Sequence, residues 1–430
     1  MRRSSRATSF NDLVEQKKEA VHPAAAIPGD GAVRTGRGGP GQWRWPALAM
    51  FTVGYGANQF VPLLAVYRRD LGLSDAAATA VFGVYALGLV PGFLIGGPAS
   101  DRHGRRRIMI ASAALSLLAT AVLITGHWGV AGLYAGRLLT GVVSGTAFTV
   151  GTAWVKELSG GSVGTAARRS ALALTAGFGV GPLVAGPLAE WAPFPTVLPY
   201  LLHLVLAGVA LALLPRAAET RPAGSSGSGR PRIIPQAARS GRFPRIVAPM
   251  APWVFGSVTI VFTTLPAHGV QALPRLGVAF PGLLAAFALA AGLGGQRAGQ
   301  RLHQASAARG DVRGPAIGLA VIVVGYLAAA LATARPGLLT VLAAALILGS
   351  GYGVCLVVGL REVERLAAPA ELGGLIALYY SLAYLGLAIP YLLALAAPHL
   401  GYPAALVVAA AAAAVTLVAV LVQGHRTPAR

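Results

Sequence analysis

A short segment, Gly97–Arg107, places one aspartate and four arginines between two strongly apolar stretches. Asp101 can accept hydrogen bonds from Arg102 or Arg105, and it can face the positive N-terminus of a helix. Gly104 permits the tight turn that would bring these groups together. The residues alone allow two interpretations, an ion-paired turn that needs a partner or a basic anchor at a membrane surface.

Arg137 lies inside a later apolar stretch and is followed at helical spacing by Gly141 and Gly145. A charged side chain at membrane depth is costly, so it usually faces a wet cavity or a partner and marks a functional position. Arg137 is only about two helical turns from the end of its stretch. Its side chain could therefore extend to the interface instead, and both interpretations remain open at this point.

Other polar side chains stand in the first apolar stretch, at Tyr55, Asn58 and Gln59. Tyr55 and Gln59 are four residues apart, so they share one face of a helix near its middle and could line a solute cavity. Alternatively, Asn58 and Gln59 only bond neighbouring helices. His203, in the sixth stretch, could titrate near neutral pH, although a lone histidine there is more often a hydrogen-bonded packing residue.

The sequence shows no constellation typical of an enzyme. No clustered nucleophile, carboxylate pair or set of metal ligands falls at membrane depth, and the one cysteine, Cys355, lies in an apolar stretch. We therefore expect no catalytic site, metal site or cofactor. No aspartate or glutamate lies near the middle of an apolar stretch, although proton carriers usually need one. Proton coupling would depend on Arg137, His203 or the Asp101 segment.

The elements that must position these residues are long apolar helices. Hydrophobic residues make up 55% of the 430 residues and charged residues only 11%, which is too little charge for a water-exposed surface. The apolar residues arrive in blocks of roughly 18 to 25, the length that crosses a bilayer as helix. We predict an all-α integral membrane protein with twelve transmembrane helices in two six-helix bundles. The expected spans are Pro46–Tyr67, Ala78–Ala99, Ile108–Thr125, Val130–Ala153, Ala171–Leu188, Thr196–Leu214, Ile246–Leu265, Leu276–Leu293, Pro315–Ala334, Leu338–Leu360, Leu372–Ala397 and Pro403–Val422.

The spans divide the chain into a disordered tail (1–45), a bundle (46–214), a basic linker (215–245), a second bundle (246–422) and a short tail (423–430). An even number of spans places both tails, the linker and the Asp101 segment on one side. Most of the basic residues behind the net charge of +21 lie there. The positive-inside rule makes that side the cytoplasm, so we expect a multi-pass protein of the cell inner (plasma) membrane and no nucleic-acid partner.

The fifth span carries a further ladder of small residues, which generic close packing of helices would also explain. The ladder is formed by Gly177, Gly181, Pro182 and Gly186. It is similar to the G-x-x-x-G-P-x-x-G-G signature of drug:proton antiporters of the major facilitator superfamily, with Ala185 replacing one glycine. Arg137, Gly141 and Gly145 resemble that family's R-x-x-x-G-x-x-x-G pattern. Its loop signature, G-x-x-x-D-R-x-G-R-R, is matched at Gly97, Asp101, Arg102, Gly104, Arg105 and Arg106.

The resemblance implies a secondary transporter with a central cavity. In that family the loop is thought to latch the two bundles in the outward-open state, which would give Asp101 and Arg102 a gating role. The first helix of each three-helix unit lines the cavity. The candidate cavity residues are therefore Tyr55, Asn58, Gln59, Arg137, Phe262 and Tyr352.

From the resemblance we expect proton-coupled efflux of lipophilic or amphipathic small molecules by alternating access. The partners would be a small-molecule substrate, protons as the coupling ion and the lipid bilayer, and we expect a monomer. A cavity poor in fixed charge favours an uncharged or apolar solute. The alternative is an importer or facilitator of a small polar metabolite such as a sugar or organic acid, which would raise rather than lower solute accumulation.

Overall fold

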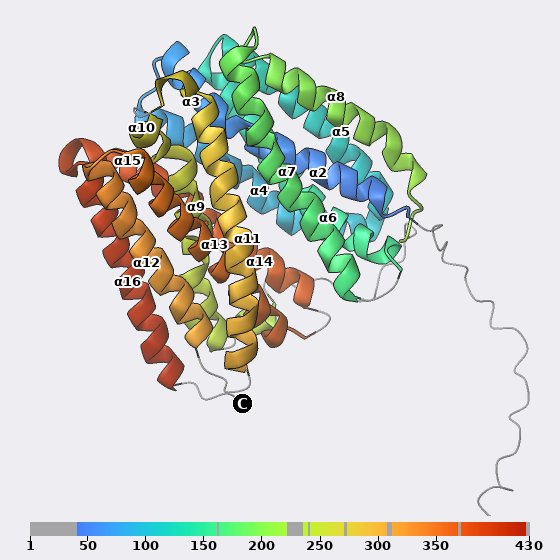
Figure 1. Ribbon diagram of the computed structural model, residues 1–430. Helices are drawn as coiled ribbons and strands as arrows, with labels where there is room; N and C mark the ends of the chain where they lie inside the picture. Colours follow the sequence, from blue (N-terminus) through green and yellow to red (C-terminus); the bar gives the residue numbers. More distant parts are fainter. Residues whose placement is uncertain are drawn as a thin grey trace, which may run out of the picture. The chain divides into compact units, whose positions relative to one another are not determined.

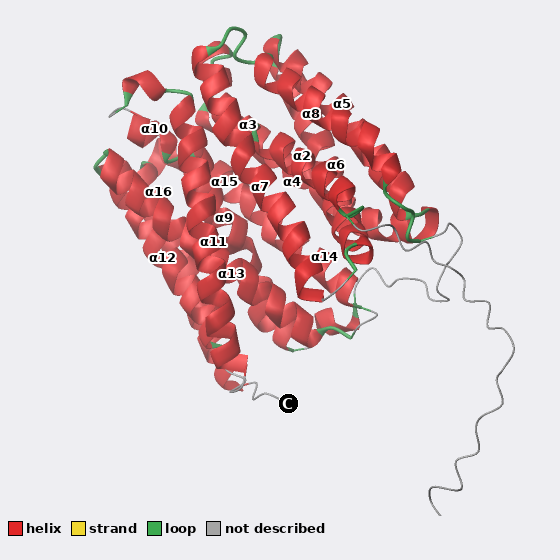
Figure 2. Ribbon diagram, turned by 45° about the vertical axis from the view of Figure 1, so that its right-hand side comes forward, coloured by secondary structure: helices red, strands yellow, loops and turns green. Residues whose placement is uncertain are grey.

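The computed structural model describes residues 41–160, 163–221, 235–239, 241–270, 273–307, 312–368 and 371–426. Helices account for most of these residues, and no strand occurs among them, as Figure 2 shows. The expected N-terminal tail up to residue 40, linker residues 222–234 and 240, and the last four residues lie outside the described part.

The helices before the linker form the first bundle. They are α2 (Arg44–Asn58), α3 (Phe60–Asp70), α4 (Asp75–His103), α5 (Arg105–Ile124), α6 (Val130–Leu158), α7 (Val163–Trp191) and α8 (Leu198–Leu213). Short 3-10 turns, Thr125–His127 and Leu214–Arg216, extend α5 and α8. In Figure 1, α2, α5, α6 and α8 lie together as parts of this bundle.

The helices after the linker form the second bundle. They are α9 (Ala248–Thr263), α10 (Pro266–Gly269), α11 (Ala279–Ala307), α12 (Arg313–Ala334), α13 (Leu338–Leu366), α14 (Leu372–Tyr384), α15 (Ile389–Leu400) and α16 (Tyr402–Arg426). A π-helical turn, Phe243–Val247, precedes α9, and short 3-10 helices cover Gln236–Arg239, Pro274–Leu276 and Leu385–Ala388.

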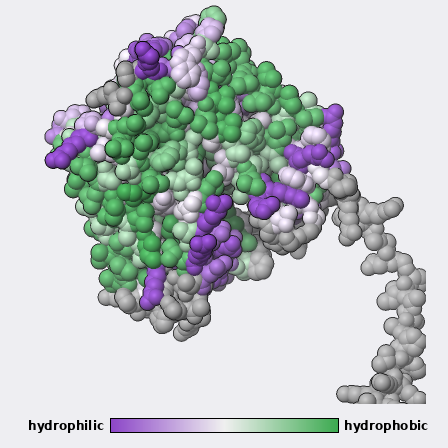
Figure 3. All heavy atoms as spheres, viewed as in Figure 1, coloured by the Kyte–Doolittle hydropathy of each residue, from purple (hydrophilic) through white to green (hydrophobic). Residues whose placement is uncertain are grey.

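Twelve helical segments within the described residues are long and apolar enough to cross a membrane. Six precede the linker and six follow it, and each overlaps one of the spans expected from the sequence, so the fold prediction is confirmed. In Figure 3 hydrophobic residues cover the middle of the visible face, and hydrophilic residues gather near the helix ends. This distribution suits helices whose sides face lipid and whose ends face water.

Three of the twelve segments are interrupted, and the breaks in the first and the eleventh fall inside spans that were expected to be single helices. The first breaks at Gln59 between α2 and α3, the seventh between α9 and α10, and the eleventh at the 3-10 turn Leu385–Ala388. A proline follows each break within one turn, at Pro62, Pro266 and Pro390. Proline has no N–H to continue the helical ladder, and neighbouring helices make such breaks tolerable inside a membrane protein.

Glycines bring α4 and α6 into backbone contact in the first bundle. A Cβ atom placed on Gly141 would lie only 2.1 Å from the carbonyl oxygen of Tyr85. Helices α11 and α13 repeat this contact in the second bundle, where a Cβ on Gly353 would lie 2.0 Å from the carbonyl oxygen of Gly292. Side chains larger than hydrogen are therefore excluded at Gly141 and Gly353, which lie in the corresponding helix pair of each bundle.

We expect Gly141→Ala to destabilise the protein by about 1–3 kcal/mol, because the added methyl group would force α4 and α6 apart. Gly179→Ala is the matched control, since a Cβ on this helical glycine would meet no atom within 4 Å. Thermal unfolding of both purified variants in detergent tests the contact. Equal unfolding temperatures for the two variants would contradict it.

Candidate functional site

A pocket, here called the central pocket, lies between the two bundles beside the three helix breaks. The first bundle contributes Asn58, Phe82, Tyr85, Arg137 and Phe178, and the second contributes Phe255, Val258, Thr259, Phe262, Leu289, Tyr352, Tyr384 and Leu387. Seven of these thirteen residues are phenylalanine or tyrosine, and none is an aspartate or glutamate. The pocket therefore combines apolar ring surface with hydroxyl, amide and guanidinium groups, a composition typical of small-molecule sites.

Arg137 is the one charged residue among the thirteen described residues that line the central pocket, and its side chain does not reach the membrane interface. The residue is only 1% exposed. It donates from Nη1 to the carbonyl oxygen of Ala57 (2.9 Å) and from Nη2 to that of Phe82 (3.2 Å). Its guanidinium also lies 4.6 Å from the ring centre of Tyr85 and 4.7 Å from that of Phe60. Neutral carbonyls and ring faces thus surround this cation.

Four of the six expected cavity residues line the central pocket: Asn58, Arg137, Phe262 and Tyr352. Asn58 donates from its amide to the carbonyl oxygen of Phe178 (3.2 Å), so it both lines the pocket and joins α2 to α7. Phe262 and Tyr352 come from α9 and α13, on the opposite wall. The pocket therefore draws on the first, fourth, seventh and tenth spans, together with others.

Tyr55 and Gln59 are placed elsewhere, packed inside the first bundle. Tyr55 stacks on His203 with ring centres 5.9 Å apart, and Gln59 is fully buried at the α2–α3 break. His203 interacts with the Thr120 hydroxyl (2.8 Å) and the carbonyl oxygen of Thr52 (3.0 Å). It is thus a hydrogen-bonded packing residue, one of the two interpretations that the sequence allowed.

Most of the aromatic lining was not predicted from the sequence, including Phe82, Phe255 and Tyr384. Phe255 and Tyr384 stack with ring centres 4.0 Å apart, and Tyr85 meets Tyr384 edge-on at 6.1 Å, which links the two bundles. Phenylalanine and tyrosine in an apolar span serve equally for lining a pocket and for packing between helices, so no signal in one sequence separates a lining ring from a packing ring.

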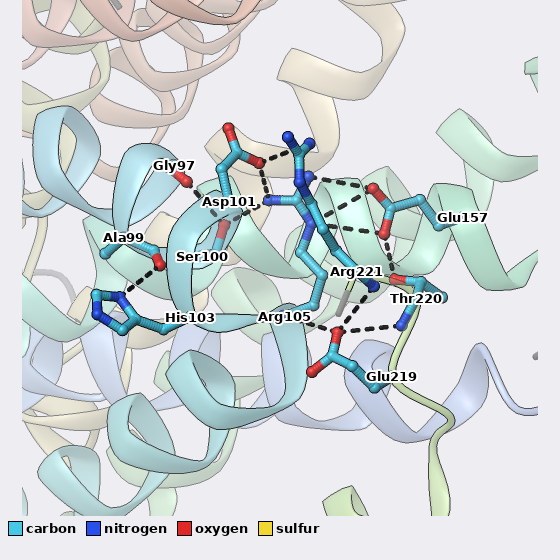
Figure 4. Close-up of polar contacts among 10 residues, drawn as sticks. All are labelled: Gly97, Ala99, Ser100, Asp101, His103, Arg105, Glu157, Glu219, Thr220 and Arg221. Atoms are coloured by element: carbon cyan, nitrogen blue, oxygen red, sulfur yellow. Dashed lines mark hydrogen bonds and ion pairs between the residues drawn. The ribbon is translucent and has the colours of Figure 1, made fainter. Parts of the chain in front are cut away.

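The Gly97–Arg107 segment forms a network of ion pairs at one end of the helices, shown in Figure 4. Asp101 pairs with Arg105 (2.9 Å) and with Arg221 of the linker (3.1 Å), and Arg105 also pairs with Glu157 of α6 (3.1 Å). The Arg105 guanidinium donates in addition to the Ser100 hydroxyl. Of the two interpretations, the structure contains the ion-paired turn, which here joins α4, α5, α6 and the linker.

The carboxylate at the N-terminus of α5 is that of Glu219, where the sequence had suggested Asp101. Its two oxygens accept the backbone N–H groups of Arg105 and Arg106, both at 2.9 Å. A carboxylate here satisfies free N–H groups and complements the helix dipole. Gly104, with φ of +94°, makes the turn that exposes these N–H groups. Glu219 lies in the linker, 114 residues from Arg105, so spacing could not reveal it.

The fifth-span ladder packs against two different helices. Cβ atoms on Gly177 and Gly181 would lie 2.2 Å from the carbonyl oxygen of Phe51 and 2.5 Å from that of Tyr55, so this part of the ladder packs on α2. Gly186 instead faces Ala279 of α11, in the second bundle. A Cβ on Gly282 of α11 would in turn lie 2.3 Å from the carbonyl oxygen of Pro182. The ladder therefore packs against α11 of the second bundle as well as against α2 of the first bundle.

The end of the helices that carries the Asp101 network is called the basic end, and the end that carries Arg68–Asp75 and Gly269–Ala279 is called the opposite end. At the opposite end the bundles are bonded directly. Glu190 of α7 accepts the N–H groups of Val278 and Ala279 (2.9 Å to the latter), at the start of α11. Tyr402 of α16 donates its hydroxyl to Asp75 of α4 (2.7 Å). These bonds join the two bundles at the opposite end.

Comparison with known proteins identifies a family. Residues 47–309 match the Major Facilitator Superfamily. Among curated proteins, the 3-(3-hydroxy-phenyl)propionate transporter of Escherichia coli (strain K12) is 42% identical over 81 residues, or 19% of this chain. The multidrug resistance protein D of the same organism is 36% identical over 66 residues, or 15% of this chain. Multidrug resistance protein MdtL of Klebsiella pneumoniae is 28% identical over 102 residues, or 24% of this chain. The matches span only 20%, 17% and 26% of these relatives' own lengths.

Solved structures match over nearly the whole chain. A POT family transporter in complex with 5-aminolevulinic acid has a TM-score of 0.71 at 13% identity, covering 90% of this chain and 96% of that one. The peptide transporter POT in complex with sulfate has a TM-score of 0.71 at 15% identity, covering 91% and 96%. At such low identity the likeness concerns the fold alone.

Proposed function

We propose that this chain, which belongs to the Major Facilitator Superfamily, is a secondary transporter that exports lipophilic or amphipathic small molecules by alternating access. The observation that carries the proposal is the central pocket, which lies between the bundles and is lined mainly by aromatic rings. Rings from both bundles would contact one solute, so its binding would depend on how the bundles are set against each other. The matches to two multidrug resistance proteins and the fifth-span ladder support export.

The contacts at the two ends support an alternating mechanism. The opposite end is bonded across the bundles through Glu190 and Asp75. At the basic end the ion pairs Arg105–Glu157 and Arg242–Glu362 each stay on one side of the bundle interface. During alternating access, the bonds that join the bundles at the opposite end would have to be exchanged for contacts between the bundles at the basic end.

The basic residues support placing the basic end in the cytoplasm of a bacterial cell, with the protein in the inner membrane. We propose in addition that the protein is a monomer. In that orientation the bonds of Glu190 and Asp75 between the bundles would lie at the outer side of the membrane. Proton coupling would then involve carboxylates at the bundle interface, because the central pocket is lined by none.

An accumulation assay in cells tests the function. Cells that express the protein should accumulate less of an amphipathic fluorescent dye than control cells, and an uncoupler should abolish the difference. Arg137→Ala and Asp101→Asn should reduce export, whereas Arg335→Ala, an exposed arginine between α12 and α13, should not. Equal accumulation in all strains, or an increase on expression, would contradict export.

Import of an organic acid is the second candidate function. It is favoured by Arg137, a buried cation in the central pocket, and by the match to the 3-(3-hydroxy-phenyl)propionate transporter. Energised uptake of an aromatic acid into proteoliposomes, in place of dye export, would support this alternative.

A further inference from the structure

We infer that the solute carries an anionic group, such as a carboxylate, which binds Arg137, and an aromatic ring, which binds the phenylalanines and tyrosines of the central pocket. The inference rests on the proposed function and narrows its substrate class, whichever way the solute moves. It replaces the uncharged solute that the sequence had favoured.

The charge balance of the pocket carries the first half of the inference. Arg137 is almost fully buried, and its Nε has no hydrogen-bond partner within the described residues. Its two hydrogen-bond acceptors are neutral carbonyls, and the thirteen lining residues include no acid. A buried cation without a counter-ion is costly. A bound carboxylate would supply the missing charge, and its planar oxygens suit a guanidinium.

The rings around Arg137 fix the cation in place but do not neutralise it. The guanidinium lies 4.6 Å from the ring centre of Tyr85, 4.7 Å from Phe60 and 5.3 Å from Phe82. Such cation–π contacts are weaker than a charge-assisted hydrogen bond to a carboxylate. The head group of an anionic solute would therefore bind on the wall formed by the first bundle.

The wall formed by the second bundle suits the apolar part of the solute. Phe255 stacks on Tyr384 with centres 4.0 Å apart and meets Tyr352 at 5.6 Å, and no charged side chain of this bundle lines the pocket. An aromatic ring would bind here by stacked or edge-on contacts. A solute of this class would thus contact one bundle through its charge and the other through its ring.

Three ligands with one ring system and different charges test the inference: phenylacetate, phenylacetamide and phenethylamine. Their binding to the purified full-length protein in detergent can be measured by titration calorimetry near neutral pH. We expect phenylacetate to bind at least about tenfold more tightly than phenylacetamide and phenethylamine to bind most weakly, because Arg137 attracts an anion and repels a cation.

Variants of the protein separate the contribution of the Arg137 charge to ligand binding from the contribution of the aromatic lining. Arg137→Gln should remove the preference for phenylacetate, and Arg137→Lys should retain part of it, since the charge remains. Arg335→Gln is the control and should leave the affinities of all three ligands unchanged. If Arg137→Gln does not fold, Tyr352→Ala provides the second test. It should weaken phenylacetate and phenylacetamide by the same factor and leave their ratio unchanged.

Equal binding of phenylacetate and phenylacetamide by the wild type would overturn the inference, as would an unchanged preference in Arg137→Gln. Either result would leave the proposed function standing if neutral amphipathic dyes are still exported. Conversely, an intact preference for phenylacetate without flux of any solute would contradict the proposed function. The inference that an anionic aromatic ligand binds at Arg137 would still hold. Binding of none of the three ligands would overturn the inference.

Discussion

Arg105→Gln is expected to lower the unfolding temperature by several degrees and to abolish solute flux. The Arg105 side chain is 8% exposed and contacts Asp101, Glu157 and Ser100 at once. Glutamine cannot supply the charge, so two carboxylates would remain without their shared cation. Because those acids are 46% and 34% exposed, water offsets part of the loss, and we expect a cost of about 2–3 kcal/mol. Thermal unfolding in detergent and flux into proteoliposomes measure the two effects.

Arg102→Gln is the matched control for this prediction, because both arginines belong to the same loop signature. Arg102 is exposed, whereas Arg105 is buried in the ion-pair network. The Arg102 variant should therefore unfold at the wild-type temperature. This expectation holds even if the substitution changes solute flux through an effect on another conformation of the transport cycle. If both variants lost equal stability, the stability that the loop signature contributes to this fold would not come from the ion pairs of Arg105.

Most of the fold could be predicted from the sequence because membrane spans depend on local properties. Length and apolarity alone located all twelve segments, since the bilayer selects helices whose backbone bonds are internal. The interruptions at Gln59 and in α14–α15 were not predicted. Pro62 and Pro390 were visible, but a proline can start, kink or break a helix, and tertiary packing decides between these outcomes.

The candidate site was predictable only in part. The helical repeat correctly places Tyr55 and Gln59 on one face, but it does not say which face meets the other bundle, and the pocket-lining residue is Asn58 between them. The partners of Arg105 lie 52 and 114 residues away, in α6 and the linker. Such pairings arise from how helices assemble, which periodicity does not contain.

The two ends of the protein use their carboxylates differently. At the basic end, Glu219 and Glu371 accept backbone N–H groups of α5 and of the linker helix Gln236–Arg239, so each tethers the linker to one bundle. At the opposite end, Glu190 binds the start of a helix that belongs to the other bundle. Breaking Glu190's bonds would therefore change the relation between the bundles, whereas breaking Glu219's bonds would mainly destabilise one bundle.

Glu190→Gln is accordingly expected to open the opposite end. The carboxylate satisfies two N–H groups at the N-terminus of α11 and complements the helix dipole there. The neutral amide would lose about 1–2 kcal/mol of this interaction, which shifts a two-state population by roughly 5- to 30-fold. Thr263 lines a second pocket at this end, so Thr263→Cys in a Cys355→Ser background reports its opening. A membrane-impermeant maleimide added outside should label that cysteine several-fold faster once Glu190 is replaced.

Asp70→Asn provides the matched control, because it removes one negative charge at the same end. Asp70 pairs with its neighbour Arg69 (2.7 Å), and both side chains are exposed, so its bond lies within the first bundle. Its loss should leave the labelling rate of Thr263→Cys unchanged, since surface ion pairs contribute little. Equal acceleration by both substitutions would show that net charge controls the opposite end. An unchanged rate in Glu190→Gln would show that the tight packing of Gly186 on α11 is sufficient to keep the bundles closed there.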